Sequence, residues 1–490
     1  MGKAEVMDEA ILAELHQWGG AAEMSAFEAV MWRAEVDPRL RSTTTSVLML
    51  SHAPEWERLM AGHRWVVAAV PRFRQRVVVP AFGVGNPTWV EDPDFHLDYH
   101  LRRVSLPEPG SERQLYDLAQ TLAMTPFDKA RPPWEATLVE GLEGGRAAYI
   151  LKLHHATSDG LGIIQLLARV LQRTPDGSAR TNPRSLINRA RSLTPSELAT
   201  QQVRNSLLAL PTEAAGAVSS LAGSLRDWVR NPAAFERGKN YLTSAKRVLG
   251  IKPVAGSGLF KRRSLSWRFD AIEIPLIDLK ASAKAAEATV NDAFLAGLIG
   301  GFRRYHEEMG VPIERMPIGF PISLRTENDA MGGNKFAGSQ YAAPVSETDP
   351  VARMRDIQRF VRETRAEPAL DIMIRLMPVV TRLPIAAVTA MTADFTTAQD
   401  AQISNIPGIP YPVYMAGAEI THFWPFAPVP GCGMMIAMIS HNGRCCIGIN
   451  SDRAAVTEPE LLMQCFRKGL DEVLALGKPA TATRAKRKAK

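Results

Sequence analysis

The sequence predicts an α+β protein built from two domains, each with a mainly antiparallel or mixed sheet. Three observations predict this fold class. The chain has 490 residues, which is enough for two large domains. Two stretches mix short apolar strands, hairpins and amphipathic helices, as layered α+β domains do. A segment rich in Ser, Ala, Arg, Pro and Asn separates these two stretches.

The chain therefore divides into four parts. We expect a first domain at residues 1–173, a helical connector at 174–262, a second domain at 263–476 and a basic, disordered tail at 477–490. An elongated ligand usually binds between two such domains, so we expect the functional site at their interface.

The elements of the first domain follow from apolar patterning. Tyr149, Leu151 and Leu153 alternate along one strand and should share one face. Turn residues at 141–145 should join that strand to the preceding one as a hairpin. In order, the expected elements are a strand at Ser46–Ser51, a helix at Glu55–Val70, a loop at Trp89–Tyr99, a helix at Gln114–Leu122, a hairpin of Ala136–Val139 and Ala148–Leu153, and a helix at Gly162–Leu171.

The second domain has the strongest helix and the strongest turn signal. Apolar residues recur at helical spacing through Thr289–His306, and Asn442-Gly443 is typical of a two-residue hairpin turn. In order, the expected elements are a strand at Ser264–Ile274, helices at Ile277–Ala286 and Thr289–His306, a strand at Pro317–Ser323, a hairpin within Gly431–Asn450 and a helix at Thr457–Leu476.

Composition and charge exclude several classes of protein. An apolar fraction of 46% and a charged fraction of 22% exclude wholesale disorder, a fibrous repeat and a polytopic membrane protein. The net charge is +7, but five basic residues lie within Arg484–Lys490 and the rest of the chain is nearly neutral. We therefore expect no nucleic-acid partner. The tail is either a solvated end or an arm for anionic membranes or CoA phosphates.

Cysteine content and apolar runs indicate the compartment. Four cysteines, at spacings that match no zinc motif, favour a reducing cytoplasm. The N-terminus lacks a signal-peptide core, and no apolar run is long enough for a spanning helix. The nearest candidate, Phe423–Ser440, contains prolines and glycines and should be a loop followed by a strand. Any membrane contact should be peripheral.

The informative segment is Leu151–Gly162, LKLHHATSDGLG, where a buried strand leads into a helix. Adjacent residues of an extended chain point to opposite sides, so only one of His154 and His155 can face a given cavity. Asp159 can fold back to hold the loop in a tight turn, and Gly160 would supply a backbone conformation that a Cβ resists. An imidazole can take a proton from a hydroxyl near neutral pH. This chemistry fits acyl transfer from a thioester to an alcohol, with a stabilised oxyanion.

Other interpretations of the histidine pair remain open. The pair could be structural or lie on the surface. A metal site is disfavoured, because no HExxH motif or third clustered ligand lies nearby. No GxSxG elbow surrounds Ser158, and no phosphate-binding GxxxxGK[ST] loop occurs.

HHATSDG resembles the HHxxxDG signature of CoA-dependent acyltransferases and nonribosomal-peptide condensation domains. Further segments are similar to the bacterial wax ester synthase/diacylglycerol acyltransferase family. They are PRFRQR at Pro71–Arg76, WVEDPDFHLDYHLRRVSLPEPG at Trp89–Gly110, PFDKARPPWEATLVEGL at Pro126–Leu142, VNDAFLAGL at Val290–Leu298, PISLR at Pro321–Arg325, GGN at Gly332–Asn334 and SNIPG at Ser404–Gly408. The resemblance implies two chloramphenicol-acetyltransferase-like domains that form a pseudo-dimer, with a tunnel at the interface between them.

The resemblance also implies roles for the histidine turn. His155 matches the base of the motif, Asp159 its acidic residue, which is mostly structural through an ionic contact with an Arg, and Gly160 its turn glycine. His154 is a less certain partner, because it should point away from the cavity that His155 faces.

Further residues match binding motifs of the family. Asn291 and Asp292 match its ND pair: Asn291 suits a helix N-cap and Asp292 the positive end of the helix dipole, or both shape a substrate channel. The other candidates for substrate binding are Trp134, Ser323, Arg325 and Asn405, of which the last three could instead serve turns and strand ends. Two segments depart from the family: the PLW motif is Pro132-Pro133-Trp134, and the entry segment EMSAFEAVMW is unusual.

The leading hypothesis is an O-acyltransferase that uses long-chain acyl-CoA and no cofactor or metal. Its acceptor would be diacylglycerol, a fatty alcohol or both, and transfer would be direct, without an acyl-enzyme. Alternatives are a condensation-type enzyme with another acceptor or a carrier-protein donor, and a weakly catalytic lipid-binding protein. The insolubility of these substrates, together with the basic tail, leads us to expect a cytoplasmic protein associated peripherally with the inner membrane or lipid droplets.

Overall fold

The computed structural model describes residues 3–81, 85–177, 193–204, 240, 243, 254–323, 336–367, 376–377, 380–381, 383 and 385–478. Most of the expected connector at 174–262 and nearly all of the expected tail at 477–490 lie outside these residues. Within the described parts of the connector, residues 195–204 are helical.

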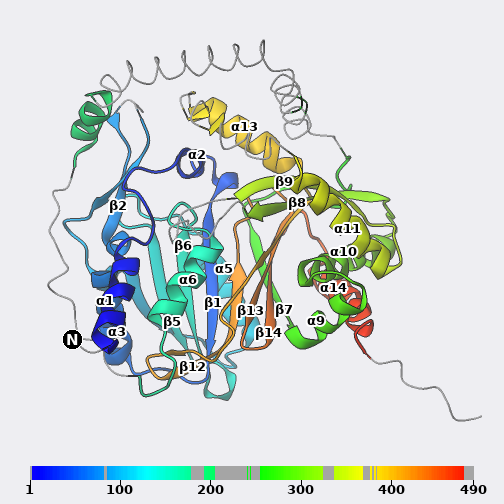
Figure 1. Ribbon diagram of the computed structural model, residues 1–490, viewed down its shortest axis with the longest axis horizontal. Helices are drawn as coiled ribbons and strands as arrows, with labels where there is room; N and C mark the ends of the chain where they lie inside the picture. Colours follow the sequence, from blue (N-terminus) through cyan, green and yellow to red (C-terminus); the bar gives the residue numbers. More distant parts are fainter. Residues whose placement is uncertain are drawn as a thin grey trace, which may run out of the picture.

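Two six-stranded mixed sheets form the centre of the molecule, and helices pack around them (Figure 1). The longer elements of the first half are α1 (Lys3–His16), α2 (Ala26–Ala34), β1 (Thr43–Leu50), α3 (Trp56–Ala69), β2 (Gln75–Val78), β3 (Thr88–Glu91), α4 (Leu97–His100), β4 (Leu101–Ser105), α5 (Glu112–Met124), β5 (Trp134–Glu140), β6 (Ala147–His154) and α6 (Gly160–Val170).

The second half continues with further strands and helices. They are β7 (Trp267–Pro275), α9 (Leu276–Ala285), α10 (Val290–Glu308), β8 (Arg315–Ser323), β9 (Phe336–Pro344), α11 (Pro350–Arg365), α13 (Ile385–Thr397), β10 (Ala401–Ile406), β11 (Tyr414–Met415), β12 (Ala418–Phe426), β13 (Met434–His441), β14 (Arg444–Asp452) and α14 (Pro459–Ala475). The mixed α+β architecture that the sequence predicts is confirmed.

The first sheet has the strand order β11-β12-β1-β6-β5-β4. Its β5–β6 hairpin matches the expected one, and Trp134 pairs with Leu153. Tyr149, Leu151 and Leu153 pack into the core beside α3 and α6, whereas Ala148 and Ile150 face α5. The alternation along β6 is therefore as predicted.

The second sheet has the order β7-β14-β13-β10-β8-β9, and β10 runs parallel to both of its neighbours. The hairpin of β13 and β14 turns at Asn442 and Gly443, which both have positive φ, at 42° and 81°. Such angles are those of the turn that the Asn-Gly pair predicts. Helices α10 and α14 pack against each other over this sheet.

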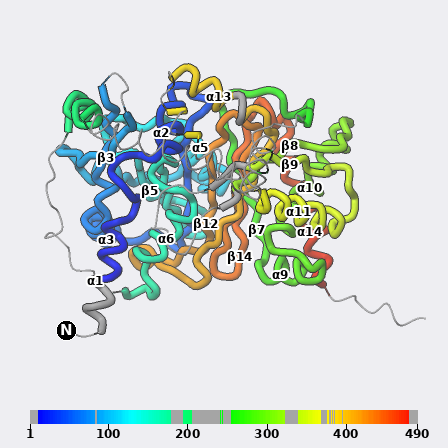
Figure 2. The backbone as a smooth tube through the Cα atoms, turned by 45° about the horizontal axis from the view of Figure 1, so that its top comes forward, coloured from blue at the N-terminus to red at the C-terminus, as the bar shows by residue number. Residues whose placement is uncertain are grey.

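The second half of the chain contributes two strands to the first sheet. β11 and β12 come from the second half of the chain, yet β12 pairs along β1 from Thr45↔Phe426 to Leu50↔Ile420. Figure 2 shows this segment in orange between the blue-to-cyan half and the green-to-red half. The sequence division at residue 263 therefore does not separate the two sheets, and the sequence did not predict this crossing.

The seam where β12 of the first sheet meets β7 and β14 of the second sheet is tightly packed. The Phe269 ring from β7 stacks on Phe426 from β12 with 4.1 Å between ring centroids. Gly448 of β14 lies against the Pro425 carbonyl, where an added Cβ would overlap that oxygen. A glycine is therefore required for β12 to cross β14 this closely.

Two expectations about elements are wrong. Trp89–Tyr99 is not only a loop, because β3 pairs with β2 and the short helix α4 ends at His100. Asn291 is not the N-cap of α10. Thr289 occupies that position, and Asp292 completes a capping box with it. A Thr three residues before an acidic residue is the pattern that should have located this cap.

The structure tests two expectations, on membrane-spanning segments and on the state of the cysteines. No helix in the described ranges has the length and apolarity to cross a bilayer. Phe423–Ser440 contains the end of β12, a loop and most of β13, so the expected loop and strand are present but a strand also precedes them. All four cysteines are buried and free.

Candidate active site

The two adjacent histidines lie at the end of β6, in the turn that leads to α6. The N–H of Thr157 donates to the His154 carbonyl at 2.9 Å, which closes the turn. The N–H of His155 donates to the carbonyl of Ser42 at 2.8 Å. Ser42 directly precedes β1, so backbone hydrogen bonds hold the turn on the first sheet.

His154 is fully buried inside the first half. Its Nδ1 accepts a hydrogen bond from the N–H of Ala156 at 3.0 Å. Its ring packs edge-on against Trp32, with 4.8 Å between centroids, and its Nε2 lies 3.6 Å from Oε1 of Glu35. His154 is therefore part of the core.

His155 is half-buried, in contrast to the fully buried His154. Because adjacent residues of an extended chain point to opposite sides, the buried position of His154 directs His155 away from this part of the core. Of the two imidazoles, His155 is the one that a substrate could reach.

Asp159 and Gly160 begin α6. The Asp159 carboxylate caps the helix, because Oδ1 accepts a hydrogen bond from the Gly162 N–H at 2.8 Å. The expectation that Gly160 supplies a backbone conformation unfavourable to other residues is wrong, since its φ is not positive. Its small size matters instead, because an added Cβ would overlap Cδ1 of Ile406 from β10. The turn therefore meets the second half of the chain at this glycine.

A buried lysine lies two residues before His154 on the same face of β6. The Nζ of Lys152 donates to the Thr125 carbonyl at 2.8 Å and lies 3.5 Å from Oε2 of Glu135. Burial lowers the pKa of Lys152, and the nearby Glu135 carboxylate opposes this shift. Lys152 is not among the predicted site residues, although a lone charge in an apolar strand is a usable signal.

Trp134 is a core residue that lies next to the histidine turn. It is buried, its Nε1 donates to the Phe73 carbonyl at 2.8 Å, and its ring stacks on His100. The Pro133 carbonyl accepts a hydrogen bond from the His154 N–H at 3.0 Å. The Pro-Pro-Trp segment thus lies beside the histidine turn.

The remaining predicted residues lie on the second half. Asn405 is half-buried on β10, next to the Ile406 that meets Gly160. Asp292 is buried, and its carboxylate accepts a hydrogen bond from the Thr289 N–H at 2.8 Å, which makes it a cap residue. Asn291 follows the first residue of α10 and is half-buried. Ser323 ends β8, and Arg325 lies outside the described residues.

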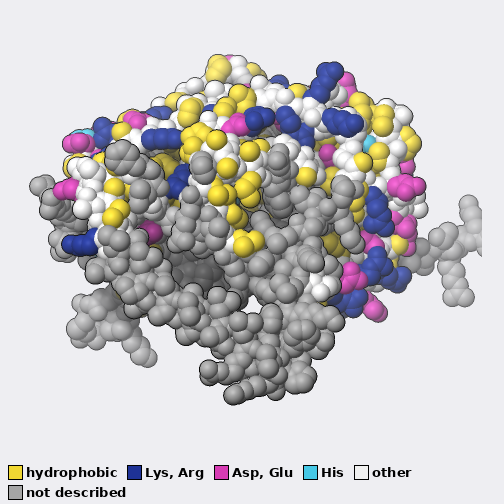
Figure 3. Space-filling view, turned by 90° about the horizontal axis from the view of Figure 1, so that it is seen from above, with side chains coloured by type: hydrophobic (Ala, Val, Ile, Leu, Met, Phe, Trp, Pro, Cys, Tyr) yellow, Lys and Arg dark blue, Asp and Glu magenta, His cyan; other side chains and the backbone are white. Residues whose placement is uncertain are grey.

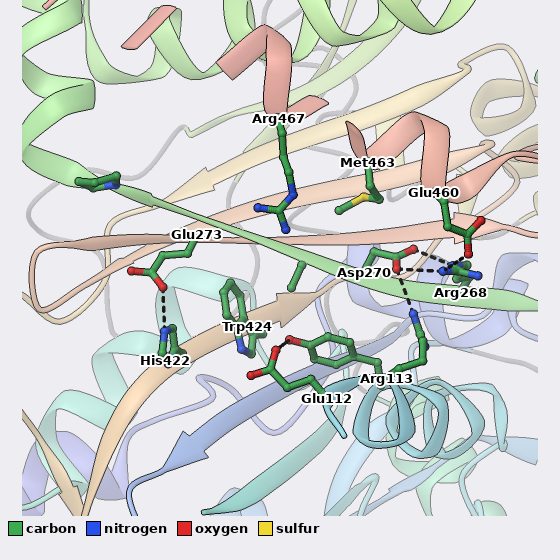
Figure 4. Close-up of a pocket in the computed structure, with 13 residues that line it drawn as sticks. Glu112, Arg113, Arg268, Asp270, Glu273, His422, Trp424, Glu460, Met463 and Arg467 are labelled. Carbon is green, nitrogen blue, oxygen red and sulfur yellow. Dashed lines mark hydrogen bonds and ion pairs between the residues drawn. The ribbon is translucent and has the colours of Figure 1, made fainter. Parts of the chain in front are cut away.

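A cavity of about 690 Å³ lies elsewhere on the seam between the halves (Figure 4). Its walls come from α5, β7, β12 and α14, and none of the predicted site residues lines it. Arg113 of α5 and Arg268 of β7 both pair with Asp270, and His422 of β12 lies 2.9 Å from Glu273. The Arg113–Asp270 pair joins the two halves of the chain, and the His422–Glu273 contact joins the two sheets, whereas Arg268 and Asp270 both lie on β7.

No group of three or more potential metal ligands occurs within the described parts of the chain. The turn instead offers one accessible imidazole, fixed backbone and a capped helix. These features suit proton transfer to or from a bound substrate.

Comparison with protein families gives two matches along the chain. The wax ester synthase/diacylglycerol acyltransferase catalytic domain matches residues 22–294, and the WS/DGAT C-terminal domain matches residues 332–473. A putative diacylglycerol O-acyltransferase of Mycobacterium tuberculosis is 40% identical over 460 residues, which cover 94% of this chain and 93% of that protein. A probable diacylglycerol O-acyltransferase of the same organism is 29% identical over 424 residues, covering 85% and 89%.

Solved structures with the same fold include two kinds of enzyme. The wax ester synthase/diacylglycerol acyltransferase from Marinobacter aquaeolei VT8 matches with a TM-score of 0.60 and 21% identity, over 89% of this chain and 96% of that one. The first condensation domain of the calcium-dependent antibiotic synthetase matches with a TM-score of 0.61 and 14% identity, over 93% and 96%. The two-domain fold is thereby confirmed, whereas the tunnel stays a prediction.

Proposed function

The chain belongs to the wax ester synthase/diacylglycerol acyltransferase family, and on this premise we propose that His155 is the general base of an acyl transfer from long-chain acyl-CoA to a lipid hydroxyl. The observation that carries the proposal is the pair of contrasting histidines in the family motif. His154 is locked in the core, whereas His155 is half-buried where the turn meets the second half.

The chemistry needs one base and an activated donor. His155 takes the proton from the acceptor hydroxyl, and the oxygen attacks the thioester carbonyl carbon to form a tetrahedral oxyanion. The oxyanion collapses, the C–S bond breaks, and the CoA thiolate leaves with the proton returned by His155. The products are an ester and CoA, and no cofactor or acyl-enzyme takes part in the proposed reaction.

We propose diacylglycerol as the principal acceptor and a long-chain alcohol as the second. Support comes from the two mycobacterial relatives, whose names give diacylglycerol as the acceptor. The condensation-domain structure is similar in fold alone, so it does not favour a carrier-protein donor. In our proposal the two substrates approach His155 from opposite sides of the interface between the halves.

We propose that the protein acts in the cytoplasm, bound peripherally to the inner membrane or to lipid droplets, because both acceptors are insoluble in water. An apolar surface near the histidine turn supports this. Val36, after α2, is 58% exposed, and Ile385 and Met391 of α13 are 45% and 51% exposed. Figure 3 shows hydrophobic side chains on the described part of this upper face.

An acceptor panel tests the proposed activity. Purified protein is mixed with palmitoyl-CoA and either diolein or hexadecanol, and release of the CoA thiol is followed with a thiol reagent. The protein's own thiols should contribute little, because they are buried and burial raises the pKa of Cys432, Cys445 and Cys446 to about 12. Thin-layer chromatography identifies the ester formed.

The variant His155→Ala should lose nearly all turnover and keep its thermal transition. The matched control is His52→Ala, which removes an exposed histidine in the loop after β1. Near-wild-type turnover of His155→Ala, or a trapped acyl-enzyme, would contradict the proposed mechanism. Release of thiol without ester would point to a thioesterase instead.

A further inference from the structure

Glu35 lies beside the histidine turn although it is far from it in sequence. It follows the last residue of α2, and its side chain is only 10% exposed. Its Oε1 accepts a hydrogen bond from the Ser42 N–H at 3.0 Å and lies 3.6 Å from Nε2 of His154. One carboxylate oxygen therefore faces both a backbone amide and an imidazole.

These two contacts connect Glu35 to both histidines, to His154 directly and to His155 through Ser42. The Ser42 residue that donates to Glu35 also accepts, through its carbonyl, the hydrogen bond from the His155 N–H at 2.8 Å. The Nδ1 of His154 is occupied as an acceptor, so the proton of the neutral ring lies on Nε2, which faces Glu35. Glu35 thus lies against the ring of His154 and is linked to the backbone of His155 through Ser42.

A buried carboxylate is costly unless its surroundings compensate it. Burial raises the pKa of Glu35, but the His154 ring, the Ser42 N–H and Lys129 outweigh burial and hold this pKa below its usual value. Glu35 is therefore an ionised group inside the first half, and the groups that keep it ionised belong mostly to the histidine turn and its support.

We propose that Glu35 is a positioning residue that holds the His155 turn in its reactive geometry. The proposal rests on the proposed role of His155. Glu35 does not touch the reacting atoms. Its contribution is the placement of Oε1, which ties α2 to the segment before β1 and to the ring of His154.

Three substitutions distinguish the position of the Glu35 side-chain oxygen from its negative charge. Glu35→Gln keeps an oxygen at the same reach without the charge, Glu35→Asp keeps the charge but withdraws the oxygen by one methylene, and Glu35→Ala removes both. Because a small misplacement of catalytic groups is costly, we expect kcat to fall about 10- to 100-fold in Glu35→Ala. We expect Glu35→Gln to retain most of kcat and to exceed Glu35→Asp, with KM for both substrates little changed in all three.

The matched control is Asp37→Ala. Asp37 is a carboxylate two residues away that accepts hydrogen bonds from Arg39 and contacts neither histidine. This variant should keep wild-type kcat. Urea unfolding of every variant shows whether a lower rate reflects a smaller folded fraction. Wild-type kcat in Glu35→Ala, or Glu35→Asp above Glu35→Gln, would overturn the proposal.

A second readout does not depend on turnover. In protein labelled with ¹⁵N-histidine, the ring signals report the tautomer, and His155→Ala helps to assign them. We expect Nδ1 of His154 to accept from the Ala156 N–H in every variant, whereas the Nε2 signal should match wild type in Glu35→Gln and should shift in Glu35→Ala, where its proton no longer faces an oxygen. Unchanged ring signals in Glu35→Ala refute the positioning role. If the wild-type protein transfers no acyl group, the proposed function fails and these spectra still decide the role of Glu35.

Discussion

The Asp159 carboxylate accepts a 2.8 Å hydrogen bond from the backbone N–H of Gly162, so the acidic residue of the histidine motif caps the helix that follows. The cap anchors one end of the turn, and the hydrogen bond from His155 to Ser42 anchors the other. His155 thus projects from a short segment that is held at both ends.

Substitutions of Asp159 should show whether its role as the N-cap of α6 or its negative charge stabilises the protein. An N-cap Asp replaced by Ala typically costs about 1 kcal/mol, whereas Asn caps nearly as well. We expect Asp159→Ala to lower the free energy of unfolding by about that amount and Asp159→Asn to lower it much less. Urea denaturation followed by circular dichroism measures both. An equal loss in the two variants would show that the charge, and not the cap, is the important property.

A methyl group at residue 160 should disturb the contact between the halves. Because an added Cβ would overlap Cδ1 of Ile406, we expect Gly160→Ala to destabilise the protein by about 1–3 kcal/mol. Ile406→Val removes the overlapping methyl, so the double variant should recover most of the loss. A thermal shift series on the four proteins tests this coupling. Purely additive effects would mean that the two residues do not meet in solution.

Local signals predicted much of the fold. The β5–β6 hairpin, the Asn442-Gly443 turn and the helix α10 each depend on residues close together in sequence, and the structure confirms them. The pairing of β12 with β1 joins segments that are far apart in the sequence, so no local pattern predicts it. The four-residue strand β3 is too short for its alternation to be distinguished from a loop.

The candidate site shows the same limit. His155 and Asp159 stand in one short motif, so the sequence is sufficient to find them. The size restriction at Gly160 depends on Ile406 from the second half, and the contact of Glu35 with the turn passes through the backbone of Ser42. Neither relationship has a sequence signal, because both arise only when distant segments pack.

Asp400 should make stability depend on pH. Burial raises its pKa to about 6, although the Ser257 N–H and Arg263 oppose this shift. A raised carboxyl pKa means that the folded state binds the proton more tightly, so stability is lost as pH rises from about 4 to about 6. We expect Asp400→Asn, whose amide oxygen can still accept from Ser257, to gain stability relative to wild type across this window.

Unfolding free energies at pH 4.5 and pH 7.5 provide the measurement. The difference between Asp400→Asn and wild type should be larger at pH 7.5, by about 1–3 kcal/mol. Asp356→Asn, which alters a carboxylate that bonds to Tyr341 on another part of the second half, serves as a comparison. A difference that does not vary with pH would mean that Asp400 titrates normally.

The exposed apolar residues of α13 should contribute to lipid binding. Ala386, Ala390 and Met391 are exposed on this helix, Ile385 lies at its start, and α13 packs against α2 near the histidine turn. Transfer of apolar surface from water into lipid is favourable, and charges placed there oppose it. We therefore expect Ile385→Glu combined with Met391→Glu to weaken binding to diolein-containing phosphatidylcholine vesicles by roughly tenfold in a sedimentation assay.

Ile277→Glu is the control, because Ile277 is 74% exposed on α9, well away from α13 (Figure 1). A protein without Arg484–Lys490 separates the basic tail from the apolar surface: its binding should drop on anionic vesicles and stay the same on neutral ones, because only the anionic surface attracts basic residues. If the α13 variant binds neutral vesicles as wild type does while Ile277→Glu does not, the lipid surface lies around α9 instead, and substrate would have to reach His155 from that side.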